Sequence, residues 1–257
     1  MYANPQEHVD CETMLSTDRP PLDPEGIDRL YFQKQVAQVP DNLRALDVLN
    51  SPFPQRGKVL EIGSFAGIFL DRIRAAGWDV TGLDPDKIPI AYARSKYNLN
   101  IVQGTLPHPA LQAGSFDAVV LLHVIEHMPD PAQNLRDIRH LLKPGGVAII
   151  ETPRFDSFMF KMLGRRERSL SNCNGHIYFF TVPTLSQLAE KNGFKVIRAD
   201  LVGRTLTLDR LCYNLGVILR SEAAKRILAR LSCALQLHRF RVHINVHDMQ
   251  RLYCRAV

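Results

Sequence analysis

The sequence predicts an α/β protein built on a doubly wound, mostly parallel sheet. Two observations carry this prediction. Residues 58–84 have the pattern of a buried strand, a glycine turn, a helix and a second strand that ends in an acid. Two later apolar runs, 116–122 and 147–153, are separated by a stretch with helical periodicity. Strands that alternate with helices form parallel sheets, in which the crossovers are right-handed.

The first unit has the features of half a nucleotide-binding site. A strand at 59–62 leads into a turn at 63–67, and a helix begins at Ile68. The next strand is followed by Asp84, which stands 21 residues after Gly63. A turn of this kind brings backbone N–H groups and a helix N-terminus to a ligand, and the acid can accept two ribose hydroxyls.

The spacing of the glycines argues against a dinucleotide. The fingerprint G-x-G-x-x-G requires glycines at 63, 65 and 68, where this chain has Gly63, Phe65 and Ile68. Glycines at 63 and 67, with Glu61 two residues before the turn, suit a different ligand. Phe65 fits the turn only if its position needs neither a positive φ nor a close backbone contact.

The second half of the chain continues the alternation of strands and helices. Its segments, in order, are an apolar strand at 116–122, H-V-I-E-H-M-P-D-P at 123–131, a helix at 132–142, the turn K-P-G-G at 143–146, a strand at 147–153, G-H-I-Y-F-F-T-V-P-T-L at 175–185, a helix at 184–192 and a strand at 194–201. This order predicts further crossovers onto the same sheet.

These motifs resemble those of the class I S-adenosylmethionine (SAM) methyltransferases, in the branch of the ubiquinone-biosynthesis and natural-product enzymes. The turn resembles E/D-x-G-x-G-x-G, with Phe65 at the middle glycine, and the resemblance runs from Lys58 to Leu201. It implies a Rossmann-like sheet of seven strands, the last antiparallel, with helical cap insertions. It also implies SAM as the cofactor and methyl transfer to an O or N atom of a small-molecule acceptor.

The resemblance implies a set of cofactor contacts along the carboxyl ends of the strands. Glu61 reaches the amino group of SAM or, alternatively, bonds the backbone of its own loop, and Asp84 accepts both ribose hydroxyls. Thr105 replaces an acid that usually contacts the adenine, so adenine recognition is weaker or moves to the backbone. The cofactor-binding residues expected are Glu61, Gly63, Ser64, Phe65, Gly67, Asp84, Pro85, Thr105, Leu106, Leu122 and His123.

Two histidines are the candidates for a catalytic base, His127 as the first choice and His176 as the second. His127 follows the fourth strand, and some sugar N-methyltransferases that resemble this chain have a functional histidine at the matching position. His176 lies in the segment that enters the next helix. An unperturbed histidine pKa of about 6.5 suits proton removal near neutral pH. Each also has a structural interpretation: a backbone bond that holds the loop for His127, and packing for His176.

No metal site is expected. The spacing His123-x-x-x-His127 would suit two ligands on a helix, but Met128-Pro129 breaks a helix there and no third ligand is evident. The five cysteines are scattered and contain no C-x-x-C pair, so neither a zinc site nor a disulfide framework is expected. This usage points to the reducing cytoplasm.

Two other functions remain as alternatives. A methyltransferase of RNA or another macromolecule is suggested by a sequence pI near 9.2, but His123-Val-Ile-Glu126 replaces the [N/D]-P-P-[Y/F] of base-methylating relatives. Cytosine-C5 relatives need a cysteine that residues 58–153 lack. A SAM-binding regulatory protein without catalysis is suggested by Phe65 and Thr105.

Composition and charge suggest the organisation of the chain. The 257 residues are 46% hydrophobic, enough for one sizeable core with additions. No secretory signal and no apolar run of about 20 residues is apparent. We expect an N-terminal arm and helical cover at 1–50, the SAM-binding core at 51–202 with a cap segment at 154–180, a helical insertion at 203–240, and the last strand at 241–257.

The net charge of +6 is unevenly distributed. Residues 154–257 contain 18 Lys and Arg against 7 Asp and Glu, whereas residues 1–153 contain 14 against 19. We predict a basic cap, formed by 154–180 and 203–240, that selects an anionic, carrier-bound or membrane-associated acceptor. A solvated basic face is the alternative, and the sequence indicates no oligomeric state.

Overall fold

The structure is a computed structural model. It describes Ile27 and residues 29–49, 56–163, 175–209, 211–212, 215 and 222–257. The chain forms two compact units: Met1–Pro40 with Arg204–Ile244, and Asp41–Gly203 with Asn245–Val257. Residues 1–26 of the predicted N-terminal arm and helical cover, and residues 164–174 of the predicted cap segment, lie outside the described residues.

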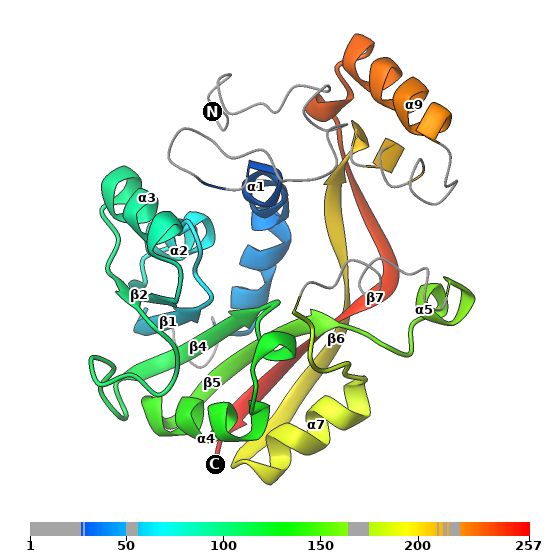
Figure 1. The fold of residues 1–257 in the computed structure, drawn as a ribbon. Coiled ribbons are helices and arrows are strands. Elements are labelled where there is room, and N and C mark those ends of the chain that lie inside the picture. The colour runs from blue at the N-terminus through cyan, green and yellow to red at the C-terminus, as the bar shows by residue number, and fades with distance from the viewer. Residues whose placement is uncertain are drawn as a thin grey trace. The chain divides into compact units, whose positions relative to one another are not determined.

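A seven-stranded sheet has the strand order β3-β2-β1-β4-β5-β7-β6 (Figure 1). The strands are β1 (Lys58–Ile62), β2 (Asp79–Asp84), β3 (Ile101–Gln103), β4 (Phe116–Leu122), β5 (Leu142–Pro153), β6 (Phe194–Thr207) and β7 (Arg241–Ala256). The first five pair in parallel, and β7 runs antiparallel to β5. The predicted mostly parallel sheet with an antiparallel last strand is confirmed.

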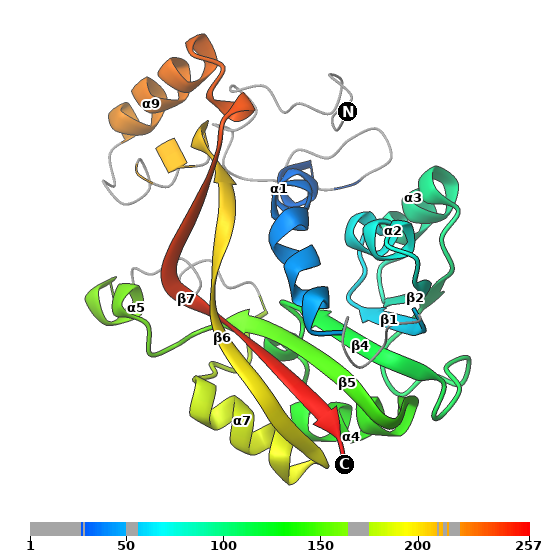
Figure 2. The same cartoon turned by 180° about the vertical axis from the view of Figure 1, so that it is seen from behind.

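Helices cover both faces of the sheet in the larger unit. Among the described residues the helical segments include α1 (Arg29–Ala45), η3 (Leu46–Leu49), α2 (Ile68–Ala75), α3 (Lys87–Tyr97), η4 (Ile125–His127), α4 (Pro131–Leu141), α5 (Phe158–Leu163), α7 (Val182–Lys191), α9 (Glu222–Ala234) and η6 (Leu237–Arg239). Figure 2 shows α2 and α3 on one face and α4 and α7 on the other.

Each face has its own hydrophobic core because strand residues alternate between the two sides. Val59 packs with α2 and α3, whereas its neighbour Leu60 packs with α4 and α7. Strands buried on both faces need continuous apolar sequences, which explains the apolar runs at 118–122 in β4 and 147–150 in β5. The sheet is therefore packed on both faces and holds the loops that follow its strands in fixed positions.

Side-chain caps fix where three helices begin. Asp86 accepts a hydrogen bond from the backbone of α3, and Asp130 accepts one at the start of α4. Thr181 and Thr184 form a reciprocal capping box at the start of α7. These caps satisfy N–H groups that a helix N-terminus leaves without partners.

Two element boundaries differ from the sequence-based expectation. The K-P-G-G segment does not form a free turn, because β5 already begins at Leu142, which pairs with Phe116 across a register shift. Strand β6 extends to Thr207, so Leu206 belongs to a strand and not to an insertion helix. Residues 143–146 fall between two registers of the β4–β5 pair, Phe116 with Leu142 and Ala118 with Val147, and so form an irregularity within β5. In β6, pairing with the neighbouring β7 overrides the local helix preference.

The sequence predicted no disulfide framework, and it did not indicate the one cysteine that is paired among the described residues. Cys233 is disulfide-bonded, whereas Cys212 and Cys254 are free thiols. Among the described residues, no helix combines the length and the apolar character needed to cross a bilayer.

Asp117 connects the beginning of β1 to the beginning of β5. Its Oδ2 accepts a 2.7 Å hydrogen bond from the backbone N–H of Lys58, and both oxygens lie 2.8 Å from the Nζ of Lys143. We expect Asp117→Ala to lower the free energy of unfolding by about 1–3 kcal/mol, because it leaves a partly buried N–H without its acceptor. Urea denaturation measures this loss.

Lys143→Ala is the matched control for the ion pair. The side chain of Lys143 is 44% exposed, so solvent screens its charge. We expect this variant to lose less than about 1 kcal/mol of unfolding free energy. An equal loss in the two variants would contradict the role assigned to the backbone bond.

Candidate active site

The carboxyl ends of four parallel strands gather the predicted cofactor residues at one edge of the sheet. Gly63 follows β1 and donates its N–H to the carbonyl of Leu83 at 2.8 Å. Gly104 follows β3 and donates to the carbonyl of Asp84, also at 2.8 Å. Strand β4 ends at Leu122, just before His123. This edge is where open α/β sheets bind their ligands.

The turn after β1 adopts left-handed backbone conformations that its glycines allow. Gly63 has φ of 75° and Gly67 has φ of 72°. A Cβ at Gly63 would collide with the side chain of Val124, and one at Gly67 would lie 2.6 Å from Leu99. Glycine is therefore required at both positions by conformation and by space.

Neither condition that the sequence set for Phe65 in this turn is met. Its φ is 46°, in the left-handed region that a bulky side chain rarely adopts. Its N–H also makes a close contact, a 2.7 Å hydrogen bond to Oδ2 of Asp84. The position thus has the conformation expected of the middle glycine in the motif, although it carries a phenylalanine.

Asp84 links the turn to the second strand. It is buried, and its Oδ1 accepts a 2.9 Å bond from the N–H of Asp86 while Oδ2 accepts the bond from Phe65. Burial raises the pKa of Asp84, and these two backbone hydrogen bonds oppose the rise. Each carboxylate oxygen has two lone pairs, so both can accept a further bond from a ligand.

Glu61 lies beneath the same turn and is the most strongly perturbed acid of the site. Burial, followed by the nearby charge of Asp84, raises the pKa of Glu61 well above its ordinary value, and a backbone hydrogen bond from Leu70 opposes the rise. Among the described residues, neither Oε2 of Glu61 nor the hydroxyl of Ser64 has a hydrogen-bond partner. A ligand with a cationic donor would satisfy this carboxylate, so the site fits the amino group of SAM.

The raised pKa predicts how pH affects stability. An acid that holds its proton more tightly when folded costs stability once it ionises, so stability falls as pH rises above the ordinary value of 4.5. We expect Glu61→Gln to be the more stable form at neutral pH, by at least about 2 °C in Tm, with no such difference below the ordinary pKa. Thermal melts at a series of pH values measure it.

Asp79→Asn is the control, because Asp79 is an exposed acid on the neighbouring strand β2. It should leave the pH profile of the wild type unchanged. A Glu61→Gln protein that is less stable than the wild type at every pH would contradict the assignment.

The other predicted cofactor residues surround this turn less closely. Leu106 packs against the core on the α4 side, and Leu122 packs against the core on the α2 side. The side chains of Pro85 and Thr105 are exposed. Leu106 and Leu122 thus provide an apolar surface near the expected adenine position. Thr105 stands where an acid would contact the adenine and offers no carboxylate.

The two predicted bases lie side by side. The ring centroids of His127 and His176 are 4.6 Å apart, at an interplanar angle of 71°. His127 donates a 3.0 Å hydrogen bond from Nδ1 to the carbonyl of Gly175, since a carbonyl can only accept. This is the type of loop-holding bond that its structural interpretation predicted. His176 has only a minor part of its side chain exposed and lines a pocket.

Glu126 is the residue that the sequence interpretation missed. Its buried carboxylate has Oε1 3.8 Å from Nδ1 of His123 and 4.0 Å from Nε2 of His176. Its carbonyl also accepts hydrogen bonds from the backbone of Ile177 and Tyr178, which hold the His176 segment in place. The sequence indicated a role for Glu126 only through its position directly before the candidate base His127.

Glu126, His127 and His176 also form a compact donor set. Their possible ligand atoms all lie within 4.8 Å of one another, whereas the sequence had suggested no third ligand. Interactions within the protein account for these positions, because His127 bonds a carbonyl and His176 faces the carboxylate. We therefore interpret the trio as an acid–base cluster and test that interpretation with a chelator below.

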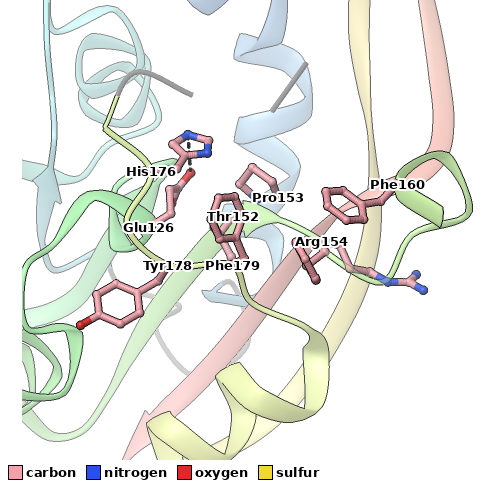
Figure 3. Close-up of a pocket in the computed structure, with 9 residues that line it drawn as sticks. Glu126, Thr152, Pro153, Arg154, Phe160, His176, Tyr178 and Phe179 are labelled. Carbon is pink, nitrogen blue, oxygen red and sulfur yellow. Dashed lines mark ion pairs between the residues drawn. The ribbon is translucent and has the colours of Figure 1, made fainter. Parts of the chain in front are cut away.

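A pocket opens beside this cluster (Figure 3). Its polar residues include Glu126, His176 and Thr152, whose buried hydroxyl has no hydrogen-bond partner among the described residues. Aromatic side chains line the rest: the rings of Phe155 and Phe160 are 4.1 Å apart, and those of Phe155 and Phe179 are 5.4 Å apart. The lining therefore combines aromatic side chains with polar groups, one of which is a buried hydroxyl without a partner among the described residues.

A buried ion-pair network lies behind His123. Nε2 of His123 is 3.5 Å from Oε1 of Glu151, and Oε2 of Glu151 accepts a 2.6 Å hydrogen bond from Nε of Arg251. Arg251 also donates to the carbonyl of Asp41. These contacts join the ends of β4, β5 and β7 and hold the His123 ring at the site.

Comparisons with known proteins agree with this geometry. A family described as a methyltransferase domain matches residues 32–199. A ubiquinone biosynthesis O-methyltransferase of Vibrio parahaemolyticus is 35% identical over 115 residues, 42% of this chain and 49% of that protein. A protein of the same name from Psychrobacter arcticus is 31% identical over 159 residues, 57% of this chain and 61% of that protein. The chain spans about half the length of the curated relatives it matches.

Solved structures show the same fold at low sequence identity. A SAM-dependent methyltransferase of Thermotoga maritima, described as a possible histamine N-methyltransferase, is 19% identical with a TM-score of 0.57, covering 89% of this chain and 94% of its own. A SAM-dependent methyltransferase of Archaeoglobus fulgidus is also 19% identical with a TM-score of 0.57, over 88% of this chain and 98% of its own.

Proposed function

Because the chain belongs to the methyltransferase-domain family, we propose that it transfers the methyl group of SAM to an O or N atom of a small-molecule acceptor. One observation supports this function most. Two buried carboxylates, Glu61 and Asp84, lie with a left-handed turn at the carboxyl edge of a parallel sheet. The amino group and the ribose hydroxyls of SAM are the groups that these two acids would bind.

The proposed binding mode divides SAM among three parts of the edge. Glu61 and the turn hold the methionine end, where the ammonium group compensates the buried charge of Glu61. Asp84 accepts the ribose hydroxyls with the lone pairs that Phe65 and Asp86 leave free. Leu106 and Leu122 pack against the adenine and the thioether.

SAM supplies a methyl group on a sulfonium, so the protein contributes alignment and proton removal. The pocket holds the acceptor in line with that methyl group and excludes water. Nε2 of His176 takes the proton from the acceptor, and the carboxylate of Glu126, 4.0 Å away, stabilises the resulting charge. His127 is the second candidate for this base. Its Nδ1 bonds the carbonyl of Gly175, so Nε2 is the nitrogen that would take the proton.

The pocket favours an acceptor with an apolar or aromatic body and one polar end. Phe155, Phe160 and Phe179 supply the apolar contacts, and Glu126 and His176 lie at the polar end. The relatives are named for both O- and N-methyl transfer, so both atoms stay within the proposal.

Release of S-adenosylhomocysteine (SAH) tests this function. The protein is incubated with SAM and a panel of hydroxylated aromatic compounds and amines, and SAH is quantified by chromatography. We expect SAH formation that depends on one class of acceptor and is unchanged by a chelator. Tight SAM binding without SAH release for any acceptor would favour a regulatory protein, and release only with RNA would favour a macromolecular substrate.

A further inference from the structure

Helix α9 is labelled in Figure 1. Two of its large apolar side chains, Ile227 and Leu231, are exposed. Ile227, Leu231 and Leu235 are 61%, 53% and 57% exposed, whereas Ser232 is 4% exposed. Ile227 and Leu231 are four residues apart on α9 and share one side of the helix, and Leu235 follows directly after its last residue. A helix that covers a protein core presents the opposite arrangement, with its apolar stripe inward.

Cationic side chains border the apolar stripe that Ile227 and Leu231 form. Arg226 and Arg230 precede Ile227 and Leu231 by one residue each and are also exposed. The helix positions put both arginines on one side of the stripe, about 100° from the apolar residues that follow them. The sequence of residues 204–244 contains 8 Lys and Arg against 2 Asp and Glu, so this surface is strongly basic.

A further exposed apolar side chain, that of Phe240, follows the end of η6. Phe240 is 56% exposed and lies between Arg239 and Arg241, which are exposed as well. Its backbone carbonyl accepts a 3.0 Å hydrogen bond from the N–H of Leu208, which fixes this part of the chain. Aromatic and aliphatic side chains flanked by arginine are thus repeated within one unit.

We propose that the exposed face of α9, together with Phe240, docks on an anionic lipid surface. The apolar stripe would enter the boundary of the acyl chains, and the arginines would meet the lipid phosphates. A second copy of the chain is a less suitable partner, because a two-fold interface would oppose the arginines of one copy to those of the other. The proposal concerns binding alone and does not depend on methyl transfer.

Vesicle sedimentation tests the apolar contribution. The full chain is mixed with vesicles of phosphatidylglycerol and phosphatidylcholine, without SAM or acceptor, and the bound fraction is measured against lipid concentration. We expect Ile227→Gln with Leu231→Gln to weaken binding by at least about tenfold. The matched control is Ile197→Gln with Leu201→Gln, two exposed apolar residues of β6, and should bind as the wild type does.

The charge contribution is tested in the same assay. Arg226→Gln with Arg230→Gln should weaken binding by about fivefold per charge, and rising salt should weaken wild-type binding. The control is Lys191→Gln with Lys195→Gln, two exposed cations outside α9. Vesicles of phosphatidylcholine alone should bind much less than those with phosphatidylglycerol.

Three results would overturn the proposal. The first is the absence of wild-type binding to anionic vesicles, and the second is equal binding by the α9 variants and their controls. The third is a concentration-dependent dimer, seen in analytical ultracentrifugation, that the Ile227 and Leu231 changes abolish. Because the assay contains neither SAM nor acceptor, failure here leaves the proposed methyl transfer untouched, and failure of methyl transfer leaves this result untouched.

Discussion

Replacing Asp84 with alanine is expected to weaken SAM binding roughly ten- to a hundredfold or more, since each charge-assisted hydrogen bond contributes about 1.5–3 kcal/mol. Asp84 serves twice in this account. It binds the ribose hydroxyls, and it accepts the N–H of Phe65 that fixes the turn. Isothermal titration calorimetry of SAM with the wild type and the variant measures the loss.

Asp86→Ala is the matched control for this experiment. Asp86 is an exposed acid two residues away that caps α3 through the N–H of Ile88. Its loss should lower stability by about 1 kcal/mol while SAM affinity stays near that of the wild type. Unchanged SAM affinity in a folded Asp84→Ala protein would contradict the assignment of the ribose site.

Loss of the proposed base should produce the largest kinetic effect. His176→Ala is expected to lower kcat by roughly 10²–10⁴-fold, while SAM affinity and Tm stay close to those of the wild type. Glu126→Gln should lower kcat as well, because the amide cannot stabilise a protonated His176 as a carboxylate does. Steady-state kinetics with an acceptor identified by SAH release measures both.

His127→Ala distinguishes the two histidines. His127 is exposed and bonds the Gly175 carbonyl, so its loss should mainly loosen the segment that carries His176. A larger fall in kcat for His127→Ala than for His176→Ala would exchange their roles. Near-normal kcat in both variants would mean that the protein catalyses by alignment alone.

The sequence predicted the frame of the molecule because the frame depends on local patterns. The centres of strands β4 and β5 are buried on both faces, and this burial favours the apolar runs at 118–122 and 147–150. Asp84 could be recognised as a candidate ligand-binding residue because it is an acid at the end of a buried strand, where packing alone does not call for a charged side chain. Local patterns of this kind were therefore sufficient to predict the family and the fold.

Features that depend on distant contacts were not predictable. The positive φ of Phe65 is held by Asp84, 19 residues away, and the buried position of Glu126 depends on the segment at 175–178. The disulfide of Cys233 likewise has no local pattern in the sequence. The number of basic residues in the insertion could be read from the sequence. The exposure of Ile227 and Leu231 could not, because it depends on how α9 packs.

A crystal structure of the protein with SAH tests the central claim most directly. We expect the ribose hydroxyls within hydrogen-bonding distance of both Asp84 oxygens and the amino group beside Glu61, with the sulfur facing the His176 pocket. SAH bound away from the turn at 63–67, or a protein crystallised with saturating SAH that holds none, would contradict the account.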